Sequence, residues 1–342
     1  MPPFAKGDFV SFLAPMQDIT DAGFMRIVAS CGAPDFFMAE YFRIHEYYCL
    51  DSDVLKAVLS RPAGKTVAAQ FIGEDEYYIE KAIDELSQYP QITMLDLNIG
   101  CPAPKIYRKN VGGGLLRDAK KIESILKTMR AKWRGCLSAK MRLGFDSSDG
   151  FLDIFKTVAD CGVDFITVHG RTVRQLYRGG VDYQKIARAA EISPVPVIAN
   201  GDISTAEKAV EIAKTTKCGG VMIGRHAVRN PWIFLQISQL LRGESAFEPT
   251  LADLRKYIDA LASNILEQSP KIKHGDSRLK KFLNFAAVGV DSAGDFLRKM
   301  RRAEGMDELL RVCDECLLGE NAQRKFNCGG YDNLCARPNH EL

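Results

Sequence analysis

The sequence predicts an α/β protein: a (β/α)8 TIM barrel followed by a small all-helical domain and a cysteine-rich C-terminal tail. Three observations predict it. Short apolar runs alternate with amphipathic helical patterns over residues 9–223. Polar residues directly follow several of these runs, as at the active-site end of such a barrel. Beyond residue 233 the strand pattern stops and only helical patterns continue.

The eight expected strands are short, apolar and not alternating, as is typical of parallel strands buried on both faces. They are Phe9–Leu13, Phe36–Ala39, Thr66–Phe71, Met94–Leu97, Leu137–Met141, Phe165–Val168, Val195–Ala199 and Gly220–Ile223. A doubly wound sheet would share the alternation of strand and helix. The count of eight and the polar residues at the strand ends favour a closed barrel.

The 342 residues suffice for one barrel of about 250 residues and a smaller module. We expect the catalytic barrel over 1–241, a helical RNA-binding domain over 246–312 and the cysteine-rich tail over 313–342. The composition, 46% hydrophobic and 26% charged, is typical of a soluble globular protein. No apolar run is long enough to span a bilayer, and the N-terminal residues lack the apolar core of a signal peptide. We therefore expect a cytoplasmic protein whose ten cysteines are thiols or metal ligands.

Five groups of residues at strand ends suggest a site for flavin mononucleotide (FMN). Backbone amides after the first strand could meet the flavin edge, an amide side chain could pair with its pyrimidine ring, and a lysine could stabilise negative charge on it. Phosphate commonly binds at the last strands of a barrel. The groups are Ala14-Pro15-Met16 with Gln17, Gln70, Lys140, Asn200-Gly201-Asp202 and Gly224-Arg225.

A cysteine lies where the fourth strand ends, in Asn98-Ile99-Gly100-Cys101-Pro102. A thiol that keeps its proton is a competent general acid. The alternative is a small buried residue at a tight corner, which suits the other cysteines outside the tail better. A Gly-Cys-Pro corner at a strand tip should face the active site, so we expect Cys101 to be catalytic.

The net charge is only +3, but nine Lys or Arg residues and three Asp residues fall between Lys271 and Arg302. Taken alone, such a run is most simply a solvated helix face. Beside a flavin barrel, a face that contacts RNA becomes the better interpretation.

Taken together, the motifs resemble those of the tRNA-dihydrouridine synthases from about Phe12 to Phe234. The motifs that carry the resemblance are Ala14-Pro15-Met16 with Thr20-Asp21, Asn98-Ile99-Gly100-Cys101-Pro102, Gly112-Gly113-Gly114-Leu115-Leu116, Lys140-Met141-Arg142-Leu143-Gly144, His169-Gly170-Arg171-Thr172, Ile198-Ala199-Asn200-Gly201-Asp202, and Met222-Ile223-Gly224-Arg225 with Pro231-Trp232-Ile233-Phe234. The helical module resembles the family's RNA-binding domain more loosely, through Arg278 to Phe285. The chain departs from the family at Asp18, where the family usually has Gly, and that carboxylate would cap the helix beginning near Asp21.

The resemblance implies that NADPH reduces FMN, which then delivers a hydride from N5 to C6 of a uracil in tRNA, while Cys101 protonates C5. It further implies flavin contacts from Lys140 and His169 and uracil contacts from Asn98 and Arg171. A loop carrying Tyr107, Arg108 and Lys109 would close over the target nucleotide. Arg278, Lys280 and Lys281 would contact the tRNA, and a monomer is favoured.

Two other functions fit parts of the pattern. One is an FMN barrel that reduces a free pyrimidine or another small enone, for which the basic helical module would have no use. The other is an RNA-binding protein on a barrel that has lost its activity, against which Cys101, Lys140 and Asn200 argue.

The tail carries Cys313, Cys316, Cys328 and Cys335, spaced C-x2-C-x11-C-x6-C. The alternatives are metal binding and a disordered tail with incidental thiols, and the spacing favours metal. Structural zinc usually uses two short pairs, whereas iron–sulfur clusters tolerate irregular spacing, so a [4Fe-4S] cluster is expected ahead of zinc.

Overall fold

The computed structural model describes residues 3–5, 7–268 and 275–329, and the chain divides into two compact units. Unit 1 comprises Met1–Met25, Pro34–Gly201 and Ala209–Ile223. Unit 2 comprises Arg26–Ala33, Asp202–Lys208 and Gly224–Leu342.

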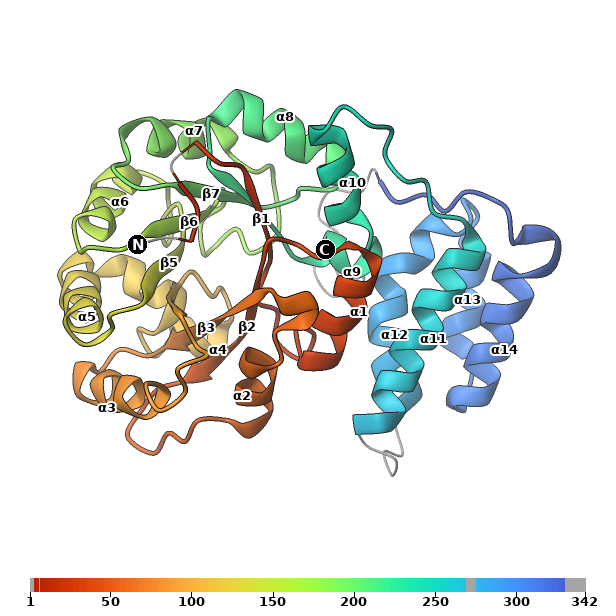
Figure 1. Ribbon diagram of the computed structural model, residues 1–342, viewed down its shortest axis with the longest axis horizontal. Helices are drawn as coiled ribbons and strands as arrows, with labels where there is room; N and C mark the ends of the chain where they lie inside the picture. The colour runs from red at the N-terminus through yellow and green to blue at the C-terminus, as the bar shows by residue number, and fades with distance from the viewer. Residues whose placement is uncertain (1–2, 6, 269–274, 330–342) are drawn as a thin grey trace. The chain divides into compact units, whose positions relative to one another are not determined.

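Unit 1 is built around a closed barrel of eight parallel strands in sequence order, with β8 paired back to β1 (Figure 1). The strands are β1 (Val10–Leu13), β2 (Phe36–Arg43), β3 (Thr66–Ile72), β4 (Met94–Ile99), β5 (Cys136–Arg142), β6 (Phe165–His169), β7 (Val197–Asn200) and β8 (Gly220–Ile223). The predicted closed barrel is therefore confirmed, and every expected run overlaps an observed strand.

Aromatic side chains fill the N-terminal end of the barrel. Phe12, Phe36 and Phe165 belong to one buried cluster, together with Phe4 from the segment before β1. The rings of Phe12 and Phe36 stack with centroids 4.9 Å apart, and the Phe4 ring lies 5.5 Å from that of Phe165. This end of the barrel is thus a packed apolar core, which leaves the carboxyl ends of the strands for polar chemistry.

Polar side chains continue the inward-facing positions towards the carboxyl ends of the strands. Alternate residues of a strand point to the same face, so Asp96 and Asn98 follow the core residue Met94 on the inside of β4. On β5, their register partners are Ser138 and Lys140. The barrel therefore changes from an apolar to a polar interior within four residues of one strand.

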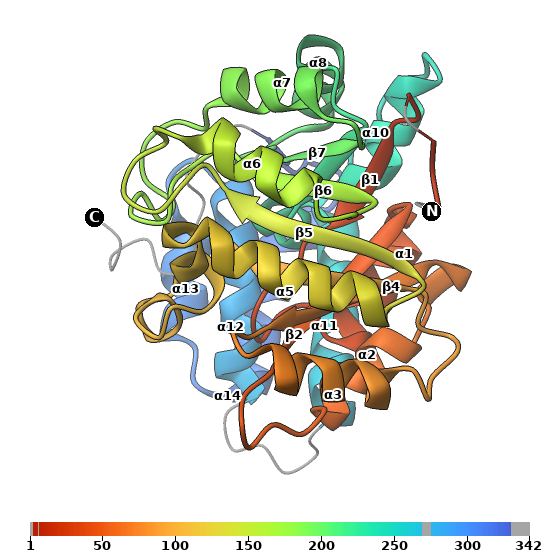
Figure 2. The ribbon, with the colours of Figure 1, turned by 90° about the vertical axis from the view of Figure 1, so that its left-hand side faces the viewer.

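Among the described residues, the α-helices that lie wholly within unit 1 are α2 (Ser52–Leu59), α3 (Glu76–Leu86), α4 (Pro104–Tyr107), α5 (Ala119–Lys132), α6 (Phe151–Ala159) and α7 (Tyr183–Ile192). Helices α3, α5 and α6 lie side by side outside the strands (Figure 2). Residues of both units form α1 (Ala22–Gly32) and α8 (Ala206–Thr216).

Among the described residues of unit 2 that follow β8, the α-helices are α9 (Arg225–Arg229), α10 (Ile233–Leu241), α11 (Leu251–Gln268), α12 (Gly275–Ala286), α13 (Asp295–Arg302) and α14 (Gly305–Leu317). Helices α11, α12 and α14 pack on one another, and α13 packs on α12 and α14. The helical region predicted after the barrel is thus present. Its described residues also include an isolated β-bridge between Thr250 and Lys325. Within the residues described, no helix is both long and apolar enough to cross a membrane.

Candidate active site

Strands β3, β4 and β5 bring a buried hydrogen-bonded network together inside the barrel. Gln70 Nε2 donates to Asp96 Oδ2 at 2.7 Å, and Ser138 Oγ donates to Asp96 Oδ1 at 2.6 Å. Asn98 Nδ2 donates to Gln70 Oε1 at 2.8 Å. Gln70, Asp96 and Ser138 have no exposed surface, and burial raises the pKa of the Asp96 carboxyl to about 6. Gln70 and Asn98 are the residues expected to contact flavin and uracil, whereas Asp96 and Ser138 are not among the predicted site residues.

The Cys101 corner is shaped by Asn98 and by two glycines. Asn98 Oδ1 accepts the backbone N–H groups of Gly100 at 3.1 Å and Cys101 at 2.9 Å. The N–H of Gly113 donates to the Cys101 carbonyl at 3.1 Å, and a Cβ on Gly113 would lie 2.7 Å from that oxygen. Gly112 has φ +57°, and a Cβ there would lie 3.0 Å from the Cys101 Cβ. The corner therefore depends on the Gly112-Gly113 segment packing directly against it.

Burial raises the pKa of the Cys101 thiol above its usual value of 9.0, although Arg142, Lys140 and a hydrogen bond from Tyr41 oppose the shift. The thiol consequently keeps its proton at neutral pH, as a general acid requires and a nucleophile does not. Tyr41, at the carboxyl end of β2, is a neighbour of Cys101 that is not among the predicted site residues.

Lys140 and Arg142 place two cations on β5 near this thiol. Burial, reinforced by the charge of Arg142, lowers the pKa of Lys140 from 10.5 to about 8, and Asp96 partly offsets the effect. Arg142 Nη1 donates to the carbonyls of Thr172 at 2.8 Å and Leu176 at 2.7 Å, which fixes the guanidinium to the loop after β6. Lys140 is therefore the more adaptable of the two cations.

The ends of β6 and β7 carry three more of the expected site residues. Register pairing places His169 beside both Arg142 and Asn200. Asn200 Nδ2 donates to the Met222 carbonyl at 2.7 Å, so this amide also ties β7 to β8. Gly201 has φ +117°, and a Cβ there would lie 3.3 Å from His169 Cε1. This glycine lets the chain pass close to the histidine.

Arg171 is buried and holds its own loop. Its Nε donates to the carbonyls of Arg178 at 3.2 Å and Gly179 at 3.1 Å, and its Nη2 donates to Gly179 at 2.6 Å. The expected contact between Arg171 and uracil stays a prediction, and the contacts in the structure position the segment around residues 178–179.

The loop after β1 forms a tight turn. Met16 N–H donates to Thr20 Oγ1 at 2.7 Å, and the same hydroxyl donates back to the Met16 carbonyl at 3.0 Å. Asp18 adopts φ +56°, a conformation that favours glycine, and its N–H donates to Glu40 Oε2 at 3.0 Å. The expected cap is wrong: Asp21, not Asp18, accepts the N–H of Phe24 at 2.7 Å at the start of α1.

Pro15 and Gln17 lie in the same turn, and Gln17 Oε1 is 3.5 Å from the Tyr41 hydroxyl. Arg108 and Lys109 are exposed just after α4, as a loop that contacts a nucleotide would need. Tyr107 is fixed at both its carbonyl and its ring, by Arg117 Nη2 at 2.8 Å and by the Phe145 ring at 5.3 Å.

In unit 2, the buried Asp202 and the partly exposed Arg225 form an ion pair with a separation of 2.8 Å. Gly224 precedes α9, which is only five residues long. Arg225, which belongs to the pair predicted to bind phosphate after β8, is therefore held by Asp202 through a charge-assisted hydrogen bond.

The helical region gives Lys280 a structural contact. Its ammonium donates to the Ala303 carbonyl at the end of α13 and lies 3.6 Å from Asp276 on its own helix. Arg278 and Lys281 are partly exposed on the same helix, and Arg298, Lys299, Arg301 and Arg302 are exposed on α13. Basic side chains on both α12 and α13 are therefore at least partly exposed, and Lys280 also links the two helices.

The predicted metal site at Cys313, Cys316, Cys328 and Cys335 is not supported. Within residues 3–5, 7–268 and 275–329, no three His, Cys, Asp or Glu side chains come together in a way that could hold a metal ion. Cys335 lies outside the described residues. Burial raises the pKa values of the Cys313 and Cys328 thiols to about 12.

Helical packing explains where the tail cysteines lie. Leu309, Cys313 and Leu317 are spaced four residues apart on one face of α14, and none has exposed surface. Cys328 lies with its sulfur 3.6 Å from the Phe326 carbonyl. Cys313 is thus a core residue of the helical region. Cys313 and Cys316 lie one helical turn apart in α14, which accounts for the short Cys-x-x-Cys spacing.

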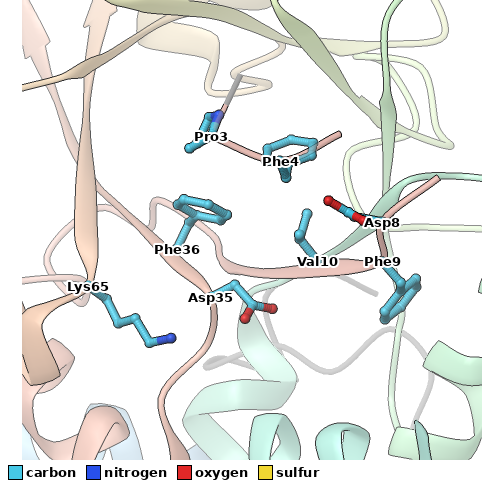
Figure 3. Close-up of a pocket in the computed structure, with 8 residues that line it drawn as sticks. All are labelled: Pro3, Phe4, Asp8, Phe9, Val10, Asp35, Phe36 and Lys65. Carbon is cyan, nitrogen blue, oxygen red and sulfur yellow. The ribbon is translucent and has the colours of Figure 1, made fainter. Parts of the chain in front are cut away.

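A pocket at the opposite end of the barrel is not part of this site. Figure 3 shows its lining, which includes Phe4, Phe36, Asp35 and Lys65 around the N-terminal ends of β1 and β2. Asp35 is engaged by the Ser11 amide and hydroxyl, both at 2.9 Å. Because the aromatic core closes the barrel here, this pocket is separated from Cys101.

The fold and the site define a class: a (β/α)8-barrel enzyme with a proton-bearing thiol and a lysine at the ends of neighbouring strands. The family model for dihydrouridine synthase (Dus) matches residues 12–322. The chain therefore belongs to the dihydrouridine synthase family, and it is an oxidoreductase.

Curated relatives agree with this assignment. A probable tRNA-dihydrouridine synthase of Helicobacter pylori is 36% identical over 66% of this chain and 69% of its own length. The tRNA-dihydrouridine synthase B of Pasteurella multocida is 34% identical over 70% of this chain and 72% of its own. The tRNA-dihydrouridine(16) synthase of Neisseria meningitidis serogroup A is 28% identical over 88% of this chain and 92% of its own. Among solved structures, a 2-naphthoyl-CoA reductase shares the fold, with a TM-score of 0.51 and 10% identity over 71% of this chain and 52% of that one.

Proposed function

We propose that this chain reduces specific uridines of tRNA to 5,6-dihydrouridine, with FMN as cofactor and NADPH as reductant, in the cytoplasm. The observation that carries the proposal is the Cys101 thiol, whose proton is retained by burial and whose backbone is held by Asn98 beside Lys140. The family assignment and the names of the relatives supply the substrate class.

The residues present fit a flavin. His169 and Asn200 pair in register at the ends of β6 and β7, and Lys140 lies two residues before Arg142, the register partner of His169 on β5. Thr167, the register partner of Lys140, has a buried hydroxyl without a hydrogen-bond partner among the described residues. Lys140, His169 and Asn200 would hold the cofactor. When bound, FMN accepts two electrons from NADPH and supplies a hydride to C6 of uracil.

The chain's own residues would supply the proton. The Cys101 S–H bond breaks as a C–H bond forms at C5, so each uridine consumes one NADPH and one proton overall. The thiolate left behind lies near the Arg142 and Lys140 charges, which lower the pKa of this thiol and so stabilise the anion until solvent reprotonates it. Asn98 keeps the corner in place throughout through the Gly100 and Cys101 amides.

Replacement of Cys101 by alanine tests the acid role. We expect dihydrouridine formation in a tRNA transcript, measured by nucleoside mass spectrometry, to fall at least 100-fold, within the range for loss of a general acid. Bleaching of the flavin by NADPH without oxygen should persist. Cys49→Ala, at an exposed cysteine, is the matched control. Full dihydrouridine formation by Cys101→Ala would refute the acid role.

Charge reversal at Lys281 tests tRNA against a small-molecule substrate. Lys281→Glu should weaken reduction of tRNA and leave flavin bleaching by NADPH unchanged, because phosphate contacts act through charge. Lys120→Glu, at an exposed position of α5, is the control. Lys280→Glu adds a cost in folding because Lys280 contacts Ala303. Equal rates with free uridine and tRNA would favour the small-molecule alternative.

A further inference from the structure

A chain of hydrogen bonds with a fixed direction runs from the Cys101 backbone to a buried carboxylate. The amides of Gly100 and Cys101 donate to Asn98 Oδ1. Asn98 Nδ2 donates to Gln70 Oε1, and Gln70 Nε2 donates to Asp96 Oδ2. Each link is 2.7 to 3.1 Å long, and every link lies within unit 1.

Only the two ends of this chain determine its direction. A side-chain amide can rotate by 180° and exchange its donor and acceptor, so Asn98 and Gln70 fit a chain of either direction. The backbone N–H groups at one end can only donate. The ionised Asp96 carboxylate at the other end can only accept. The two amides are therefore held in one orientation because donors at the corner face an acceptor in the barrel.

The environment of Gln70 supports this orientation independently. Its Nε2 also lies 3.2 Å from Met38 Sδ, which is a weak acceptor and not a donor. The second oxygen of Asp96 is occupied by the Ser138 hydroxyl, so the carboxylate is held by donors on both sides.

We propose that Asp96 is a positioning residue, which sets the orientation of Asn98 through Gln70 and thereby holds the Cys101 corner in place for proton transfer. This inference rests on the proposed function only for the statement that Cys101 transfers a proton. The statement that Asp96 holds the Cys101 corner in place does not need a bound flavin. Asp96 does not touch the reacting atoms.

Asp96→Asn tests the direction of the chain. An asparagine that accepts from Ser138 presents its NH2 group to Gln70 Nε2, so two donors face each other. Rotation of Gln70 moves the clash to Asn98, and rotation of Asn98 moves it to the Cys101 backbone amide, which cannot rotate. Rotation of the asparagine itself moves the conflict to Ser138, whose hydroxyl then accepts from the new NH2 group and loses Asp96 as the acceptor of its own proton. One donor is therefore left without an acceptor wherever the amides settle, and we expect the corner to loosen.

The measurement is the rate of alkylation of Cys101 by iodoacetamide against pH, followed by peptide mass spectrometry, in the enzyme as purified. With two corner hydrogen bonds weakened, the rate should rise by about tenfold. The apparent thiol pKa should fall towards its ordinary value, because burial is what raises it. Cys49, which is exposed, serves as an internal standard.

Ser138→Ala is the matched control. It removes a hydrogen bond from the same carboxylate but leaves Asp96 as the acceptor for Gln70. If Asp96 mattered only as a buried group, both variants would alter Cys101 alike. We expect Ser138→Ala to leave its alkylation close to that of the wild type.

The double variant Asp96→Asn with Gln70→Glu restores the pattern at unchanged net charge. The carboxylate introduced at position 70 then accepts both from the amide introduced at position 96 and from Asn98, and only the weak contact with Met38 is lost. Return of the Cys101 alkylation rate to the wild-type value supports the proposal, and so does a folded double variant if Asp96→Asn alone does not fold. An unchanged rate in Asp96→Asn, or no rescue in the double variant, overturns it.

The alkylation assay tests the positioning role of Asp96, and the dihydrouridine assay tests the proposed function, so that each can fail without the other. If the chain did not reduce uridine at all, the alkylation pattern of the variants would still stand or fall on the hydrogen-bond direction. If dihydrouridine forms normally but the alkylation pattern is absent, the positioning role is wrong and the proposed function survives.

Discussion

Replacing Lys140 by methionine should stabilise the ligand-free barrel while weakening its hold on flavin. Lys140 lies among buried residues of β5, and burial together with Arg142 lowers its pKa from 10.5 to about 8. That fall of about 2.5 corresponds to about 3 kcal/mol lost from the free energy of unfolding when the ammonium is charged. Methionine fills a similar volume without a charge to desolvate.

The expected gain is smaller than this upper value for two reasons. The Lys140 side chain is partly exposed, so water solvates some of its charge. Asp96 also loses a nearby cation, which raises the cost of its own buried charge. A gain of about 1–2 kcal/mol remains, which corresponds to roughly 2–8 °C in the melting temperature.

The pH dependence gives the decisive test. The unfolded chain keeps the Lys140 proton up to about pH 10.5, whereas the folded chain releases it near pH 8. The free energy of unfolding of the wild type therefore rises relative to that of Lys140→Met between about pH 8 and 10.5, so the extra stability of the variant should shrink over that interval. Melting curves of both proteins, freed of flavin, measure the difference. Lys56→Met, at an exposed lysine, should show neither effect.

Flavin binding should move in the opposite direction. Loss of a charge-assisted contact should weaken FMN binding about tenfold or more, as measured by flavin fluorescence. A variant that melts at or below the wild-type temperature at pH 7, or a difference that does not change with pH, would refute the burial argument.

Two further substitutions test the packing around the site. Gly220→Ala should lower the free energy of unfolding, measured by urea titration, by about 3 kcal/mol or prevent folding. The new Cβ would lie 2.1 Å from the Val10 carbonyl oxygen, where β8 closes the barrel. Gly180→Ala, which has open space around the new Cβ, is the control and should leave the free energy of unfolding nearly unchanged. Arg229→Met should speed hydrogen exchange at the Asn327 amide, because the buried guanidinium donates to the Asn327 carbonyl at 2.6 Å, and an unchanged exchange rate would contradict this role.

Much of the barrel could be predicted because parallel strands buried on both faces leave continuous apolar runs. The runs located the strands but ended them early. β4 continues through Asn98, β6 through His169 and β7 through Asn200, since the ladder extends into the polar residues that carry the chemistry. β2 runs on to Arg43 past an irregularity in its pairing with β3, between Met38 and Tyr41. Hydrophobicity alone cannot show where hydrogen bonding stops.

The residues beneath the site were harder to find. Asp96 was visible as the one carboxylate inside a four-residue apolar run, which should have marked it as a buried group with partners. Its partners could not be predicted, because Gln70 and Ser138 come from different strands and meet it only through barrel register. The prediction of a metal site in the cysteine tail failed for a different reason. The cysteine spacing suggested metal ligands, whereas the four-residue repeat of Leu309, Cys313 and Leu317 indicates the buried face of a helix.

Burial shifts the pKa values of Cys101 and Lys140 in opposite directions, and these shifts define the pH range in which both groups are in their active forms. It raises the pKa of Cys101 above 9.0, so the acid keeps its proton, and lowers that of Lys140 to about 8, so the cation is the first to lose its charge. The alkaline limit of kcat/KM should therefore lie near pH 8 and belong to Lys140 rather than to the thiol. Below that limit both groups are in the form that proton delivery and anion stabilisation need. Lys140→Arg, whose guanidinium stays charged, should move the limit upward in a pH profile of tRNA reduction. A limit that stays near pH 8 in this variant would assign it to another group and remove Lys140 from control of the rate.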